Sequence, residues 1–382
     1  MPKAVAVKGN VLSYKGSAYL RQRLVLAVLS GKSVKIEDIR KYDIDPGIQE
    51  FEVNLVRLLD KVTNGSYIKL DETGTSLFFQ PGMIHGGTIE HDCSLDRSIG
   101  YYLEVLILLA PFCKNPLHVT LKGVTNNKID PSVDHIKASV LPVLRKFMLN
   151  DEGLELKILK RGMRPLGGGE VVFKCPIQNQ LNPVHILNQG KVKRIRGTAY
   201  AVRVSPTMAN RMVEAAKGVL LKFIPDVFVT TDHCRGKQSG NSPGFGIHLV
   251  AETTEGVFYS AEAISNLVAE DKEPSVAEDV GVTAAQRLLI EIYQGGCVDS
   301  VAQSIACVFM TLGQKNVSRI IVGSLTDYTI AFLRNIRDFF GITFKVDYYI
   351  EEDSNPEEQE GAPKISLICI GAGYTNLNKR YL

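Results

Sequence analysis

The sequence predicts an α/β (α+β) fold: a strand–helix–strand–helix–strand–strand (βαβαββ) unit occurs three times and forms a large domain, and a smaller α/β domain is inserted late in the chain. Apolar residues switch repeatedly between two-residue and helical spacing. The order of elements in residues 3–81 recurs from residue 86 onward, and residues 187–270 interrupt it. We therefore expect a large domain of residues 1–186 and 271–382 around an inserted domain of residues 187–270.

The first unit contains two helical segments, each closely followed by a glycine. One strand lies between the helices and two strands follow the second helix. Glycine is common just past a helix end because it adopts the left-handed conformation without strain. The helices are residues 19–30 and 48–63, followed by Gly31 and Gly65, and the strands are residues 33–36, 66–70 and 76–79.

The same spacings recur twice, with the strands marked by alternating apolar residues between turn residues. The second copy has strand 86–90, helix 99–109, strand 118–121, helix 133–147 and strands 154–159 and 170–174. The third copy needs helix 282–293, apolar stretch 298–311, strand 319–322, helix 329–340 and strands 343–349 and 364–370.

The interrupting segment has its own α/β pattern. It begins with a basic stretch at residues 191–196 and carries a polar, glycine-rich loop at residues 235–244. Its predicted strands are residues 199–204, 226–231, 246–252 and 257–261, and its helix is residues 206–222.

Composition narrows the class of protein. No apolar run approaches the roughly 18 residues that a membrane span needs. The seven cysteines form no C-x-x-C pair, which predicts reduced thiols in an intracellular protein and no zinc site. Net charge is +3, but residues 351–360 carry six acids and no base, so the remainder stands at +3 plus 6, or +9. A mildly basic remainder permits a polyanionic partner.

One glycine-rich loop, residues 161–171, stands out. Gly167, Gly168 and Gly169 lie between two arginines, Arg161 and Arg164, and an apolar strand. Consecutive glycines allow positive φ and close approach of the backbone to another group. The loop is either a tight hairpin with solvated arginines or a loop that cradles phosphate.

Several stretches resemble signature sequences of RNA 3′-terminal phosphate cyclases. They are residues 123–127 (GVTNN), 131–136 (PSVDHI) and 164–169 (RPLGGG), and Pro-Gly turns of that family match residues 45–47 and 79–82. The resemblance runs nearly end to end. It implies three βαβαββ repeats in a large domain with a small inserted α/β domain, as the periodicity also predicts.

The chain departs from this family where the family does chemistry. The resemblance places the nucleotidylated histidine of cyclases in residues 323–330 (GSLTDYTI), which contain no histidine, and His248 is the last histidine of the chain. Tyr14 and Ala18 replace an acid and a glutamine of the N-terminal signature, whereas Arg21 is retained.

Two nucleotide-contacting positions of the family also change. A glutamine there falls at about Ile107, and an Asp-Gln pair falls near Gln303-Ser304. Nucleotidyl transfer needs positioned charge and an activated nucleophile. We therefore expect no catalytic residue, no cofactor and no metal.

Residues 14–21 and 295–300 resemble a cyclase-like branch of the family that is nucleolar in eukaryotes. The resemblance to that branch implies early processing of small-subunit ribosomal RNA (18S rRNA) in the nucleus and nucleolus. It also implies a ribosome-biogenesis GTPase and pre-ribosomal RNA, or the pre-ribosomal particle, as partners. We expect no membrane association and a monomer in isolation.

The candidate anion- or RNA-binding residues are basic, amide or glycine positions of the matching stretches and loops. Arg21 is either paired with an acid or exposed in an anion pocket, and Arg40 is either solvated or a phosphate contact. Asn126 is either a satisfied turn residue or a ligand-binding residue. The full set is Arg21, Arg40, Asn126, Arg164, Gly167, Gly168, Gly169, Arg235 and Lys237.

The basic stretch of the insertion is a second candidate, for a partner or RNA. As a strand it places Lys191 and Lys193 on one face and Arg194 and Arg196 on the other. Such a pattern suits a twisted edge strand or a strand covered by a partner. Basic residues on an edge strand also act as simple solubility devices.

Three functions remain open on this reading. The first is a non-catalytic RNA- and protein-binding factor of the pre-ribosome. The second is an endonuclease that cleaves pre-ribosomal RNA at a new site on the same scaffold. The third is an active cyclase, which the missing histidine argues against.

Overall fold

The computed structural model describes residues 11–266, 274–349 and 361–376. The acidic segment 351–360 lies outside the described residues. The helices are α1 (Leu20–Ser30), α2 (Glu50–Val62), α3 (Ile99–Leu109), α4 (Val133–His135), α5 (Leu141–Phe147), α6 (Thr207–Leu220), α7 (Ala277–Gln294), α8 (Gln303–Leu312) and α9 (Asp327–Phe340). A π-helical turn, Ile136–Val140, joins α4 to α5.

Three four-stranded sheets share one topology, which confirms the predicted repeat. Their strand orders are β1-β2-β5-β4, β7-β8-β10-β9 and β11-β16-β18-β17. In each sheet the first two strands are parallel and the last two join antiparallel. The strands are β1 (Val11–Lys15), β2 (Ser33–Glu37), β4 (Tyr67–Leu70), β5 (Leu77–Gln80), β7 (Gly86–Asp92), β8 (Asn115–Gly123), β9 (Glu155–Lys160), β10 (Gly169–Cys175), β11 (His185–Ile186), β16 (Val317–Val322), β17 (Lys345–Tyr349) and β18 (Lys364–Ile370).

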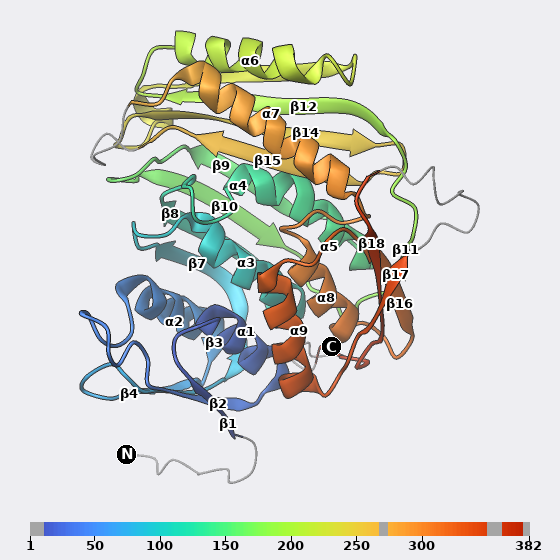
Figure 1. The fold of residues 1–382 in the computed structure, drawn as a ribbon. Coiled ribbons are helices and arrows are strands. Elements are labelled where there is room, and N and C mark those ends of the chain that lie inside the picture. Colours follow the sequence, from blue (N-terminus) through green and yellow to red (C-terminus); the bar gives the residue numbers. More distant parts are fainter. Residues whose placement is uncertain (1–10, 267–273, 350–360, 377–382) are drawn as a thin grey trace.

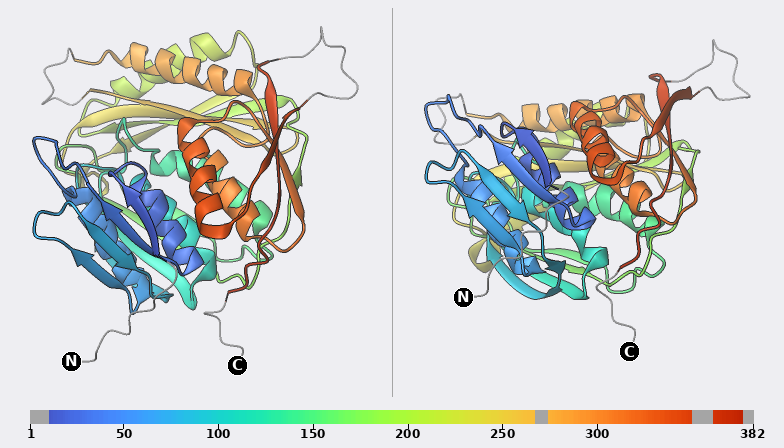
Figure 2. Two further views of the ribbon diagram at one scale, coloured as in Figure 1. Left: turned by 60° about the horizontal axis from the view of Figure 1, so that its bottom comes forward. Right: turned by 90° about the horizontal axis from the view of Figure 1, so that it is seen from below.

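Helices from all three repeats pack together between these sheets (Figures 1 and 2). Helix α1 contacts α3 and α9, and α8 contacts both α3 and α9. Every residue of α3 is buried, so its apolar side chains contribute to the common core on all sides. Helix α9 is capped at its start by Thr326, whose hydroxyl accepts from the amide of Thr329, and at its end by Gly341, which has φ 71°.

A fourth sheet, β13-β12-β14-β15, belongs to the insertion. Its strands are β12 (Val192–Val202), β13 (Val227–Cys234), β14 (Gly244–Thr253) and β15 (Phe258–Ile264). Helices α6 and α7 lie side by side over one face, and the second repeat lies below the other (Figure 1).

The segment 282–293 is helical as predicted, but its assignment to the third repeat is wrong. The corresponding helix α7 packs on the inserted sheet, where Ala284 and Leu288 join one apolar cluster with Ile247 and Leu249 of β14. The first helix of the third repeat is α8 instead. The insertion therefore separates β11 from α8.

A two-stranded sheet of β3 (Thr63–Asn64) and β6 (Met83–Ile84) joins the first repeat to the second. Among the described residues, no helix is both long enough and apolar enough to cross a membrane.

Candidate functional site

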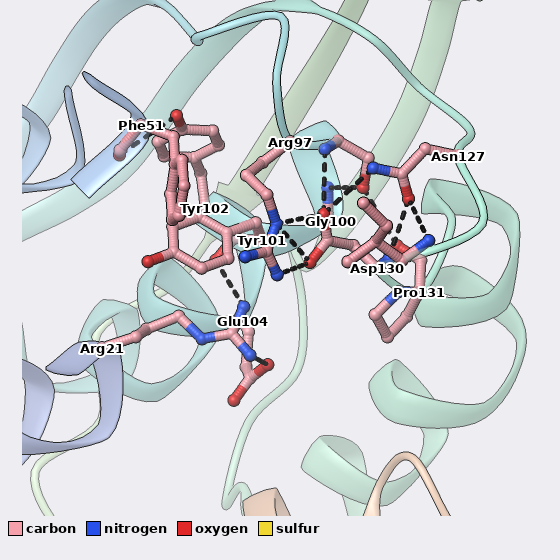
Figure 3. A network of polar contacts seen from close by, with 12 residues as sticks. Arg21, Phe51, Arg97, Gly100, Tyr101, Tyr102, Glu104, Asn127, Asp130 and Pro131 are labelled. Carbon is pink, nitrogen blue, oxygen red and sulfur yellow. Dashed lines mark hydrogen bonds and ion pairs between the residues drawn. The ribbon is translucent and has the colours of Figure 1, made fainter. Parts of the chain in front are cut away.

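Arg21 of α1 lies beside Glu104 and Tyr101 of α3 (Figure 3). Its guanidinium pairs with Glu104 of α3 at 2.7 Å and donates to the hydroxyl of Tyr328 of α9 at 2.8 Å. That hydroxyl donates in turn to Glu104 at 2.6 Å. The guanidinium also stacks on the Tyr101 ring, 4.4 Å from its centroid. One arginine therefore joins α1, α3 and α9.

This network occupies the place where an anion was expected. Burial disfavours the charge of Arg21, but Glu104 outweighs burial and raises the pKa of the guanidinium. Burial also raises the pKa of Tyr328, which stays protonated and able to donate. Of the two alternatives for Arg21, this geometry therefore shows the acid-paired one, because Glu104 and two tyrosines fill its surroundings.

Arg40 and the amides of the GVTNN stretch are likewise satisfied inside the fold. Arg40 forms a bidentate pair with Glu52, at 2.7 and 2.8 Å, and Glu52 is buried. Asn126 is buried and its amide nitrogen donates to Asp134. In this geometry both side chains are therefore held inside the fold, which supports the structural alternative for Asn126 and shows that Arg40 is not simply solvated.

Beside this stretch, Asn127 and Asp130 hold the chain that leads into α3. The side chain of Asn127 accepts from the amide of Asp130 at 2.7 Å, as expected for a self-satisfied turn. Asp130 pairs with Arg97 and accepts from the amide of Ser98 at 3.0 Å (Figure 3). Burial opposes ionisation of Asp130, but Arg97 lowers the pKa of its carboxyl.

The glycine-rich loop joins the second repeat to the insertion through backbone contacts. The amide of Gly240 donates to the carbonyl of Arg161 at 2.6 Å, and that of Asn241 donates to the carbonyl of Gly167 at 2.9 Å. A Cβ on Gly168 would lie 2.8 Å from Asn241, and one on Gly169 would lie 2.7 Å from Thr125. These glycines thus allow close packing between the loop and its neighbours, which supports the tight-loop alternative over a phosphate cradle.

Arg161 at the start of the loop is the charged link across the same seam. It pairs with Asp134 of the second repeat at 2.6 Å and with Asp232 of β13 at 2.8 Å. Burial opposes ionisation of Asp134, but Arg161 lowers the pKa of its carboxyl strongly. No local sequence pattern indicated this three-residue bridge.

The remaining loop cations are not neutralised in this way. Arg235 and Lys237 are exposed on the loop after β13, and neither pairs with a described carboxylate. Arg203 has φ 53°, and among the described residues its guanidinium donates only to the carbonyl of Gly240, at 2.7 Å. Arg203 and Arg235 line one cavity of about 460 Å³ together with Ser205. We call Arg203, Arg235 and Lys237 the basic loop surface.

Arg164 lies on the neighbouring glycine-rich loop. It is half-buried, and its guanidinium forms no hydrogen bond or ion pair with the described residues. Because that loop is docked on residues 239–242, Arg164 stays a candidate contact beside the basic loop surface.

The basic stretch of the insertion is mostly paired. Its strand, β12, lies between β13 and β14, so the expectation of an edge strand is wrong. A register shift after Val192 brings both Lys193 and Arg194 to Glu252, at 2.8 and 2.6 Å. Arg196 holds Asp226 through two contacts of 2.8 and 2.9 Å.

Lys191 precedes that strand. It is exposed and pairs with no described acid, so within residues 191–196 it is the lysine best able to meet RNA or a partner.

A buried polar cluster between the insertion and the large domain escaped sequence reasoning. His135 of α4 lies 3.2 Å from Asp299, which also accepts from the amide of Ala302 at 2.9 Å. Glu262 of β15 accepts from the amide of Ser132 at 2.9 Å. Burial opposes charge on His135, but Asp299 raises the pKa of the imidazole. His135 and Ser132 lie more than a hundred positions from Asp299 and Glu262, so spacing could not reveal these contacts.

Metal or thiol chemistry finds no support in the described part of the chain. It contains no group of three or more His, Cys, Asp or Glu side chains arranged to hold a metal ion. All seven cysteines are buried and free, and burial raises the pKa of each thiol. Such thiols are poor nucleophiles.

Comparisons with known proteins agree with the resemblance of the sequence to the cyclase family. A family model described as RNA 3′-terminal phosphate cyclase matches residues 12–346. The chain is 55% identical to the probable RNA 3′-terminal phosphate cyclase-like protein of Drosophila melanogaster, covering 99% of each chain. It is 53% identical to the human RNA 3′-terminal phosphate cyclase-like protein, over 98% of this chain and 99% of the relative. It is 44% identical to the rRNA processing protein rcl1 of Schizosaccharomyces pombe, over 97% and 99%.

Proposed function

The chain belongs to the RNA 3′-terminal phosphate cyclase family, and we propose that it acts there as a non-catalytic RNA-binding factor of ribosome biogenesis. The observation that carries this proposal is the network around Arg21. The guanidinium of Arg21 donates to the hydroxyl of Tyr328 and forms an ion pair with the carboxylate of Glu104.

The absence of a suitable nucleophile supports the non-catalytic role. Residues 323–330 contain no histidine, and His248 is the last one in the sequence. His248 itself is buried, and burial lowers the pKa of its imidazole to about 4. The curated relatives are also named cyclase-like.

The pathway follows from the relatives. The S. pombe relative is named an rRNA processing protein, which supports a role for this chain in rRNA processing. We extend this to early processing of 18S rRNA in the nucleolus, together with a ribosome-biogenesis GTPase. Cleavage of pre-rRNA by the chain itself is the alternative, and a nuclease assay with and without magnesium separates the two.

RNA would be held by the basic loop surface. Arg235 and Lys237 are exposed, unpaired cations, and each phosphate that they neutralise releases counterions. With Arg203 they lie on one side of the seam between the insertion and the second repeat.

The test is the affinity for a pre-rRNA fragment over a range of salt concentrations. Arg235→Glu with Lys237→Glu should weaken binding by at least about tenfold and lower the slope of log Kd against log salt by about two. Lys222→Glu is the matched control, because Lys222 is an exposed, unpaired lysine beyond the far end of α6. Equal losses in both variants, or none in either, would contradict the proposed surface.

A further inference from the structure

Strand β15 forms one edge of the inserted sheet. It pairs with β14 on one side through an antiparallel register in which Glu262 opposes His248. No strand among the described residues covers its other side. An uncovered edge presents a row of backbone donors and acceptors to which another chain can pair.

Two contacts identify which backbone groups face outward. The amide of Ser265 donates to Phe245 of β14, so odd-numbered residues face the sheet. The carbonyl of Glu262 instead accepts from Arg287 of α7 at 2.8 Å, from outside the sheet. Residues of the same parity share one side of a strand. Ser260, Glu262 and Ile264 therefore direct their backbone groups away from β14.

A cavity of about 770 Å³ runs along this edge. Helix α7 lines one side with Val280, Thr283, Arg287 and Ile290, which are spaced by three or four positions, and its N-cap residue Val276 lines the same side. Residues 126–131 of the second repeat line the other side. The existing sheet lies between these same two layers, so the cavity has the position that a neighbouring strand would occupy.

Two features of the lining indicate a polypeptide occupant. Ser260 lines the cavity, and its hydroxyl is buried and has no hydrogen-bond partner among the described residues, whereas such a group normally has one. Three apolar side chains at the rim are also exposed, namely Ile129 (62%), Val276 (48%) and Ile290 (55%). An extended peptide presents alternate side chains to both sides and could satisfy both features.

We propose that this cavity, the β15 slot, receives an extended segment of a partner protein that adds a fifth strand to the inserted sheet. Its backbone would pair with Ser260, Glu262 and Ile264. Side chains toward α7 would be apolar, and the opposite set would be polar, with one reaching the Ser260 hydroxyl. In the free protein Arg287 donates to the backbone carbonyl of Glu262, and it would release this carbonyl when the partner segment binds. This proposal goes beyond RNA binding and does not depend on the basic loop surface.

The test uses the full chain against a phage-displayed library of random 14-residue peptides. Selected sequences should alternate apolar and polar residues over five to seven positions. Their amides and those of Ser260, Glu262 and Ile264 should become protected from hydrogen exchange. Ile290→Asp and Val276→Asp should each weaken binding by at least about tenfold, because they place a charge against apolar side chains.

Ile370→Asp is the control for these variants, since Ile370 is similarly exposed (62%) on the third-repeat sheet. Failure to select any peptide above the background seen with Ile290→Asp protein would overturn the proposal. Peptides with a helical spacing of apolar residues would also overturn it. So would a dimer of the chain that dissociates in Ile290→Asp, because the occupant would then be a second copy.

Discussion

Among single residues, Tyr328 has the largest consequence for function. Its hydroxyl accepts from Arg21 and donates to Glu104, so it completes a charged network in a buried place. Sequence reasoning identified Arg21 and left open whether it is paired. It could not find the partner, because Arg21 and Tyr328 are 307 residues apart and no local pattern links them.

Removing that hydroxyl should destabilise the protein. Tyr328→Phe deletes the hydrogen bonds of this hydroxyl with two charged groups, so we expect the free energy of unfolding to fall by about 1.5–3 kcal/mol in urea denaturation. Tyr348→Phe is the control, because Tyr348 is 83% exposed. Equal stability of Tyr328→Phe and the unaltered protein would show that the network contributes nothing to folding.

His135 predicts a pH dependence at the same scale. Burial opposes its charge, but Asp299 raises its pKa above the ordinary value of 6.5. A raised pKa stabilises the folded state fully below about pH 6.5, and this contribution is lost as pH rises through the folded-state pKa. Stability should therefore fall with rising pH above 6.5, less steeply in His135→Gln.

The slope of the free energy of unfolding against pH should differ between His135→Gln and the unaltered protein by no more than the value for one bound proton. His118→Gln is the control, because His118 is exposed on β8. If both variants kept the slope of the unaltered protein, another group would be responsible for it.

Among the elements, the glycine-rich loop shows how far a motif can be interpreted. The sequence predicted a tight loop before a strand, and β10 does begin at Gly169. Whether its glycines face phosphate or backbone depends on residues 239–242, which lie in another domain. Likewise, helical spacing predicted α7 but could not show which sheet it covers.

Two glycine substitutions test the packing role. Gly162→Ala would place its Cβ 2.2 Å from the backbone nitrogen of Gly169, so we expect a clear loss of stability. Gly218→Ala in α6 meets nothing within 4 Å and should stabilise by up to about 1 kcal/mol. Thermal denaturation distinguishes these outcomes. A harmless Gly162→Ala would mean that the loop is not closely packed.

For the whole molecule, the insertion is joined to the second repeat through Arg161. Its bridge to Asp134 and Asp232 crosses the boundary between the inserted domain and the second repeat. The sequence located this boundary only because residues 187–270 interrupt the repeated order of strands and helices. The repeat was predictable because each copy carries its own periodicity. The seam was not, because it depends on how separate units meet.

Arg161→Met should therefore destabilise strongly. It leaves Asp134 buried without its partner, a change that costs about 3–5 kcal/mol. Arg145→Met is the control, since Arg145 pairs with Asp151 at a half-exposed surface and surface pairs contribute about 0–1 kcal/mol. Urea denaturation measures both. Similar losses in the two variants would contradict a structural bridge at Arg161.

The central claim is that a cyclase-family chain whose Arg21 is paired with Tyr328 and Glu104 does not form a covalent nucleotide adduct. The most direct measurement is incubation of the purified protein with labelled ATP and magnesium, followed by a denaturing gel, beside a catalytically active cyclase as positive control. We predict a labelled band for the active cyclase and none for this protein. A labelled band from this protein that survives denaturation would contradict the claim.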